Sequence, residues 1–183
     1  MRSVALFALW VAGPCFAGLA LAAAPTQDFA VPDHGTVTMA VPADWSSDLH
    51  QPEGRLPPTV SIKARAGAPF EMRITIMWPV GMTVKQFSEV ALEAMVEGAA
   101  KSAEPQSVEG KLAIKALSGA GGTGHYFAAT DKAPKPDEFK FLTQGMLQCG
   151  SVTLAFTILS NDGQAASVKA ALDMLLGARQ QMP

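Results

Sequence analysis

Two neighbouring stretches of the sequence alternate between apolar and polar residues, and a short turn separates them. Residues 59–65 (TVSIKAR) and 71–78 (EMRITIMW) each place every second side chain on one face, and Ala66-Gly67-Ala68-Pro69 turns the chain between them. A period of two is the pattern of a half-buried β-strand. The two stretches are therefore predicted to form an antiparallel hairpin with one face in water. The inward set is Val60, Ile62, Ala64, Met72, Ile74, Ile76 and Trp78.

Further strands are predicted on both sides of this hairpin. Before it, the turn residues Asp33-His34-Gly35 separate a short strand from a second, alternating one. The polar, proline-rich segments 46–58 and 132–138 are predicted to be loops. Because short turns join consecutive strands, the sheet should be mainly antiparallel. The predicted strands outside the hairpin are 29–31, 36–41, 106–117 (one strand or two short ones), 125–131, 139–148 and 152–160.

Two segments have the spacing of amphipathic helices. The first begins at Thr83, where Gln86 completes a capping box, and runs to about Ala100. The second follows Asn161-Asp162-Gly163 and fades by Arg179. About six to eight antiparallel strands covered by two such helices form an α+β domain, an α/β/α sandwich. The predicted apolar stripes are Val84, Phe87, Val90, Ala91, Ala94 and Met95 for the first helix, and Ala165, Val168, Ala171, Leu172, Leu175 and Leu176 for the second.

The amino terminus has the layout of a secretory signal. Arg2 precedes an uncharged apolar run from Val4 to Phe16, and small residues follow. The sequence Ala20-Leu21-Ala22 favours cleavage between Ala22 and Ala23, because a cut after Ala24 would place a proline first. A retained membrane anchor and a lipoprotein acylated at Cys15 are the alternatives.

This signal predicts both the compartment and the domain boundaries. We expect a signal peptide at 1–22, a flexible leader at 23–28 and a single α+β domain at 29–179, located in the periplasm or secreted. Removing residues 1–22 takes away Arg2 and no acid, so the net charge of −2 becomes −3. A weakly acidic chain does not favour nucleic acid, and no second long apolar run predicts a membrane span in the mature chain.

Cleavage would leave one of the two cysteines, Cys149, without an internal partner in an oxidising compartment. A half-buried small residue beside a turn is the simplest interpretation of this free thiol. The alternative is that Cys149 forms an intermolecular disulfide. A thiol enzyme would need a base near the sulfur, and His125 is the residue that the fold could bring there.

The other motifs give weaker signals. Gly119–Gly124 matches G-x-G-x-x-G, but a strand rather than a helix follows it, so a mobile loop is predicted. Glu89, Glu93 and Glu97 are predicted to lie on a solvated helix face. Trp45 and Trp78 each lie close to a proline at a strand end and are candidate contacts for a partner or ligand, the alternative being core residues. No catalytic residue, metal site or cofactor is predicted.

The layout resembles the PsbP-like superfamily of small α/β/α sandwiches, which includes many bacterial envelope proteins. The residues that carry this resemblance are Val41-Pro42-Ala43-Asp44-Trp45, the hairpin strands, the long helix from Thr83, and the late hairpin ending in Leu159-Ser160-Asn161-Asp162 before a terminal helix. The likeness covers nearly all of residues 29–179. It implies a non-enzymatic accessory role, because members of the superfamily mostly bind or support larger assemblies and share no catalytic set.

Three functions follow as hypotheses. The first is an exported, non-catalytic accessory protein that binds a protein partner or supports an envelope assembly. The second is a periplasmic protein that binds a small ligand, and the third is a hydrolase or thiol enzyme. A deep pocket with convergent polar groups would favour the second or third hypothesis, and a flat exposed apolar patch would favour the first.

Overall fold

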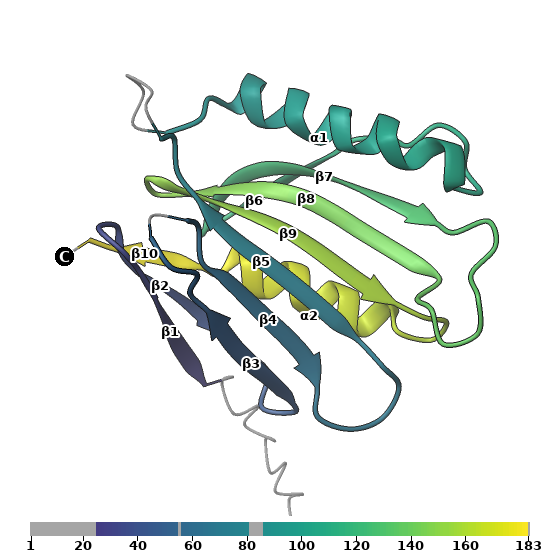
Figure 1. The fold of residues 1–183 in the computed structure, drawn as a ribbon, viewed down its shortest axis with the longest axis horizontal. Coiled ribbons are helices and arrows are strands. Elements are labelled where there is room, and N and C mark those ends of the chain that lie inside the picture. Colours follow the sequence, from purple (N-terminus) through teal and green to yellow (C-terminus); the bar gives the residue numbers. More distant parts are fainter. Residues whose placement is uncertain (1–24, 55, 81–85, 183) are drawn as a thin grey trace, which may run out of the picture.

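The structure is a computed structural model of the chain, and it describes residues 25–54, 56–80 and 86–182. Within these residues the largest element is a seven-stranded sheet, in which every neighbouring pair of strands is antiparallel (Figure 1). The predicted α+β class and antiparallel sheet are confirmed. In spatial order the strands are β3 (Trp45–His50), β4 (Thr59–Ala64), β5 (Glu71–Met77), β9 (Val152–Ser160), β8 (Phe141–Cys149), β7 (Gly122–Thr130) and β6 (Lys115–Gly119).

A second, smaller sheet joins the two ends of the described chain. It consists of β1 (Thr26–Val31), β2 (Gly35–Ala40) and β10 (Arg179–Gln181), in the order β1-β2-β10. Asp33 and Gly35 have φ values of 62° and 78°, as the predicted turn between β1 and β2 requires. The small sheet contributes buried residues to the same core as β4, β5, β9 and the last helix.

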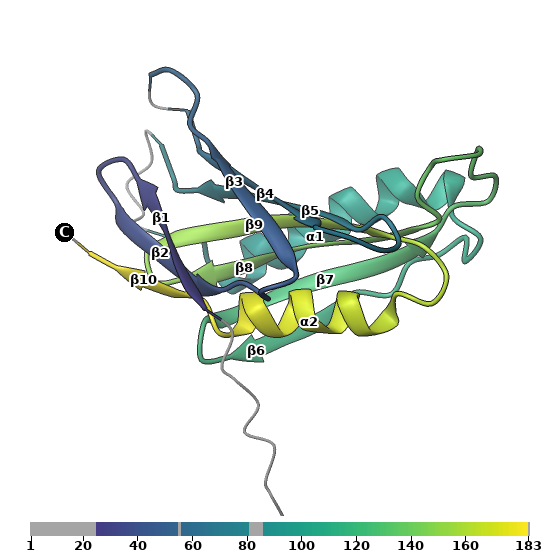
Figure 2. The same ribbon diagram turned by 90° about the horizontal axis from the view of Figure 1, so that it is seen from below.

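The two helices lie on opposite faces of the large sheet (Figures 1 and 2). Helix α1 (Glu89–Ala103) packs on β7 and β8, and a short 3-10 turn, η1 (Glu104–Gln106), follows it. Helix α2 (Ala165–Leu176) shares the other face with the small sheet. The core under α1 consists of Val96, Ala100, Leu112, Phe127 and Ala129.

The predicted hairpin of β4 and β5 is confirmed. Val60 and Ile62 on β4 and Met72, Ile74 and Ile76 on β5 are all fully buried on the α2 face. Strand β9 continues this apolar face with residues 154, 156 and 158. Alternation therefore assigned these side chains to the interior correctly, because each strand has one covered and one open face.

The prediction of a loop at 46–58 was wrong for its first residues. Strand β3 pairs with β4 from Trp45 opposite Ala64 to His50 opposite Thr59. It is an edge strand, and its outward positions are polar. Polar residues are tolerated on an edge strand that faces water, so composition alone favoured a loop.

The apolar stripe predicted for the first helix was also wrong. Thr83 and Val84 lie outside the described residues, and the helix begins at Glu89, capped by Ser88, whose Oγ accepts a hydrogen bond from the N–H of Ala91 at 3.2 Å. The buried stripe is Leu92, Val96 and Ala100, whereas Val90 is 75% exposed. The helix is rich in alanine, and small residues on several faces leave the direction of the stripe to tertiary packing.

The glycine-rich segment is not a loop. Gly119 pairs with Gly122, so Ala120 and Gly121 alone form the turn between β6 and β7. This turn packs against the end of α2, where the N–H of Gly121 donates to the carbonyl of Leu176 at 2.6 Å. A Cβ on Gly121 would lie 2.7 Å from the carbonyl oxygen of Leu175, so the glycine permits a close backbone approach.

Several boundaries differ from the predictions. Residues 26–28, assigned to a flexible leader, belong to β1, and β10 carries the domain beyond 179 to Gln181. Of the segment 106–117, only the part from Lys115 is a strand. These elements depend on partners far away in the chain, which a local pattern does not reveal.

Candidate functional site

A hollow in the surface of the described structure lies where α2 begins. It has a volume of about 390 Å³ and is called the α2 pocket below. Its floor is the α2 face of β7, β8 and β9 at their ends, where register places Ala128 beside Thr143 and Phe141 beside Ser160. The small side chains of Ala128, Thr143 and Ser160 leave space that larger residues would fill. The full lining is Glu109, Ala128, Ala129, Thr130, Phe141, Leu142, Thr143, Ser160, Asn161, Asp162, Gly163, Gln164, Ala165 and Val168.

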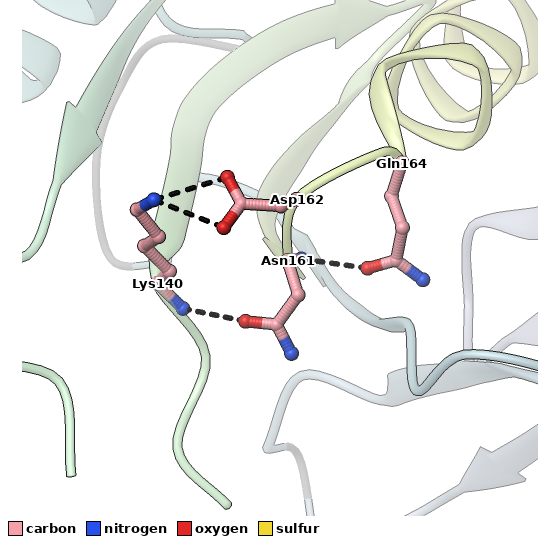
Figure 3. A network of polar contacts seen from close by, with 4 residues as sticks. All are labelled: Lys140, Asn161, Asp162 and Gln164. Carbon is pink, nitrogen blue, oxygen red and sulfur yellow. Dashed lines mark hydrogen bonds and ion pairs between the residues drawn. The ribbon is translucent and has the colours of Figure 1, made fainter. Parts of the chain in front are cut away.

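A network of polar contacts fixes the segment that leads into α2 (Figure 3). Lys140 Nζ donates to both carboxylate oxygens of Asp162 at 3.0 Å, and its backbone N–H donates to Asn161 Oδ1 at 2.9 Å. The N–H of Asn161 donates to Gln164 Oε1 at 2.6 Å, and Gln164 Nε2 donates to the carbonyl of Ala68 at 3.1 Å. Gln164 is buried, so the entry to the helix is tied to both β8 and the β4–β5 turn.

The first turn of α2 faces the pocket without a side-chain cap. The N-cap residue is Gln164, whose side chain makes no capping hydrogen bond, and the first turn contains no acidic residue. The N–H groups at a helix start have no partner within the helix and carry a partial positive charge. The 12-residue helix α2 therefore presents donors at one end of the pocket.

Two buried hydroxyl groups line the floor of the pocket. Thr143 is 6% exposed and Ser160 is 3% exposed. Neither hydroxyl oxygen is a fully enclosed polar atom without a partner, a state that His125 Nδ1 has among the described residues. The side chains of Thr143 and Ser160 place two groups at the pocket floor that can both donate and accept hydrogen bonds.

Glu109 lies at the rim of the pocket and is held by Thr130. Its carboxylate accepts a hydrogen bond from the N–H of Thr130 at 3.0 Å and from the Thr130 hydroxyl at 2.7 Å. The backbone hydrogen bond, more than any other contact, holds the pKa of Glu109 below its ordinary value. The rim therefore carries a negative charge at neutral pH.

Comparisons with known proteins give a single structural likeness to report. No family model matches the chain, and a search of curated proteins found no match. The chain is similar to a cyanobacterial PsbP. The solution structure of that protein, CyanoP from Synechocystis sp. PCC 6803, aligns with a TM-score of 0.48 and 11% sequence identity, covering 92% of this chain and 98% of the other. That protein bears the name of the superfamily that the sequence resembles.

The two tryptophans predicted as contacts do not form one site. Trp45 is 4% exposed and stacks on Phe70 with 4.7 Å between ring centroids, so it packs in the core, the alternative that the sequence left open. Trp78 is half-buried, and its ring centroid lies 4.4 Å from that of His34. Register places Trp45 and Trp78 at opposite ends of the β4–β5 hairpin, so they cannot line a common groove.

The cysteine and the histidine of the thiol-enzyme hypothesis lie on opposite faces of the large sheet. Cys149 is 1% exposed in the core under α2, and burial raises the pKa of its thiol. His125 alternates with Phe127 on the α1 face and pairs with Met146. Its Nδ1 is buried without a hydrogen-bond partner among the described residues. The sheet therefore keeps the imidazole from the sulfur, and the geometry that hypothesis requires is not present.

Other predicted features lie elsewhere. The cleavage residues Ala22 and Ala23 fall outside the described residues. Within residues 25–54, 56–80 and 86–182, no three His, Cys, Asp or Glu side chains are grouped closely enough to hold a metal ion. None of the helices described there is long and apolar enough to cross a membrane. Glu89, Glu93 and Glu97 are exposed on α1, as predicted.

A second pocket, of about 240 Å³, lies between α1 and the sheet. Its walls are largely apolar and include Phe127 and Met146. Arg73, at its mouth, is already paired with Glu71, with 2.8 Å between Nε and Oε1. The α2 pocket is the stronger candidate because it is larger and two hydroxyl side chains line its floor.

The sequence analysis missed the residues of the α2 pocket. One signal was available. Alternation places Ser160 on the same face as Leu154, Phe156 and Ile158, so it is a polar residue at an inward position. Its position diagonally across from Thr143 and beneath the start of α2 follows only from the strand register and the helix packing.

Proposed function

We propose that this chain is an exported, non-catalytic protein that binds a small polar ligand in the α2 pocket. This is the second of the three functions inferred from the sequence. The observation that carries it is a pair of largely buried residues with hydroxyl side chains, Thr143 and Ser160, which line a pocket of about 390 Å³ beside the start of α2. Both hydroxyls can donate and accept hydrogen bonds, as a polar ligand requires.

The pocket is also preorganised. The hydrogen bonds of Asn161 and Gln164 hold the start of α2 in place before any ligand arrives. Ligand pockets in proteins are usually preformed, have volumes of about 300–1,000 Å³, and combine apolar walls with a few placed polar groups. The α2 pocket has each of these properties.

A protein partner is the first hypothesis from the sequence. Five large apolar side chains of the described chain are more than half exposed, and they come from separate segments of the sequence. They are Leu56, Val80, Val90, Val108 and Met182. Binding of a protein partner stays a prediction from the sequence.

The test is an NMR screen of the purified ¹⁵N-labelled protein with a library of small polar fragments. We expect hits to shift the amide signals of Thr143, Ser160 and the first turn of α2, residues 165–167. The variants Ser160→Ala and Thr143→Val should weaken binding of the same hits, because each removes one hydroxyl from the pocket floor. A screen in which no fragment shifts these signals would contradict the proposed function.

Thr157→Val is the matched control. Thr157 belongs to the same strand as Ser160 but lies on the opposite face, where it borders the pocket under α1. This variant should leave the binding of the hits unchanged. If it weakened binding as much as Ser160→Ala does, the ligand would occupy the α1 side of the sheet instead.

A further inference from the structure

The charges around the α2 pocket are nearly balanced. Asp162 is paired with Lys140, and Glu109 is ionised at the rim. No lysine or arginine is found among the described residues that line the pocket, but the start of α2 supplies a partial positive charge. A ligand anion would meet Glu109 and Asp162, and a ligand cation would meet the helix N-terminus. This arrangement favours a ligand without a net charge.

The hydrogen-bonding groups of the pocket are mixed in kind. The hydroxyls of Thr143 and Ser160 can both donate and accept. Asn161 accepts through Oδ1 from the backbone of Lys140, so its Nδ2 supplies donors, while the carboxylate of Glu109 supplies acceptors. A ligand that carries several hydroxyl groups matches both kinds of partner, because each ligand hydroxyl also donates and accepts.

One side of the pocket is apolar. Phe141 from β8 and Val168 from α2 form this wall, together with alanines at 128 and 165. Sugar rings and related cyclic polyols have faces made of C–H groups between their hydroxyls. Such a face can pack on the wall while the hydroxyls at its edge reach the polar floor.

We propose that the ligand of the α2 pocket is a neutral polyhydroxylated compound of about the size of a monosaccharide. This inference rests on the proposed function and specifies its ligand class. The carboxylate of Glu109 then serves as a selectivity group, because it accepts hydrogen bonds from neutral hydroxyls and repels a ligand carboxylate.

The test is an NMR titration with three groups of probes of similar shape. The neutral probes are glucose, galactose, mannose and myo-inositol, the anionic probes are glucuronate and galacturonate, and the cationic probes are glucosamine and galactosamine. At least one neutral probe should shift the amides of Ser160 and residues 165–167 in a saturable manner. Its anionic counterpart should bind about tenfold more weakly, the equivalent of one close like-charge contact.

The variant Glu109→Gln tests the assigned role of the carboxylate. It should narrow the difference between each neutral sugar and its acid, because the repulsion is removed. Tighter binding of either charged group to the wild-type protein would overturn the inference. If polar fragments bound in the pocket but no neutral probe did, the inferred ligand class would be wrong and the proposed function would stand. If neither the fragments nor the sugars shifted the amide signals of the pocket, both the proposed function and the inferred ligand class would be contradicted.

Discussion

Lys140 and Asp162 form a forked ion pair, in which one ammonium group donates to both carboxylate oxygens at 3.0 Å. The two side chains remain 40% and 76% exposed. This pair joins the start of β8 to the segment that leads into α2, but water screens it. Its geometry is therefore more important for orienting the pocket entrance than for global stability.

We predict that this ion pair contributes less than about 1 kcal/mol to the free energy of unfolding. A double-mutant cycle with Lys140→Gln and Asp162→Asn, measured by urea denaturation, should give a small coupling energy that decreases with added salt. Asn161→Ala should cost more, about 1–3 kcal/mol, because it leaves the partly buried N–H of Lys140 without its acceptor. A coupling energy larger than the cost of Asn161→Ala would contradict this ranking.

Gly145→Ala should destabilise the protein by about 1–3 kcal/mol or more, because a Cβ there has no space. It would lie 2.5 Å from Tyr126 Cβ and 2.7 Å from Phe156 Cζ, and it would also overlap the carbonyl oxygen of His125. Thermal or urea unfolding would measure the loss.

Gly98→Ala is the matched control for this substitution. Gly98 lies within α1, and an added Cβ would meet no atom within 4 Å. Since alanine favours a helix over glycine, the change should stabilise the protein by about 0.5–1 kcal/mol. Equal effects at the two positions would show that packing around Gly145 does not decide the result.

Cys149 should react slowly with thiol reagents in the native protein. It is 1% exposed, and burial raises the pKa of the thiol, so both access and the thiolate fraction are low. Labelling with a chromogenic disulfide should become fast only in denaturant, and a non-reducing gel should show monomer. A disulfide-linked dimer in freshly isolated protein would contradict this and would support the intermolecular bridge.

Glu109 should make stability depend on pH in the acid range. Hydrogen bonds from Thr130 lower its pKa in the folded state below the ordinary value of 4.5. The ionised carboxylate therefore stabilises the fold above pH 4.5, and this contribution is lost as the pH falls through the lowered pKa. Melting temperatures of wild type and Glu109→Gln should differ at about pH 7 and converge at about pH 3. A difference that is unchanged at low pH would refute the assignment.

The sequence by itself determined which side chains of the β4–β5 hairpin enter the core. The alternation around Ile62 and Ile74 predicted this buried set correctly, because the strand period is a local property of the chain. For the helices it was less exact: Ala171 and Leu175 of the predicted second stripe are buried, but Ala165 is exposed and the buried Met174 was not predicted. The strand and helix periods were also enough to predict the α+β class.

Tertiary structure decided the elements and the site that depend on distant partners. Strand β3 exists because β4 pairs with it, and the turn at Gly121 is closed by the carbonyl of Leu176. The α2 pocket exists because the strand register places Thr143 beside Ile158, two residues before Ser160 on the same face of the sheet. Helix α2 begins above these residues. A pocket is space left between elements, and the sequence of any one element does not specify what packs against it.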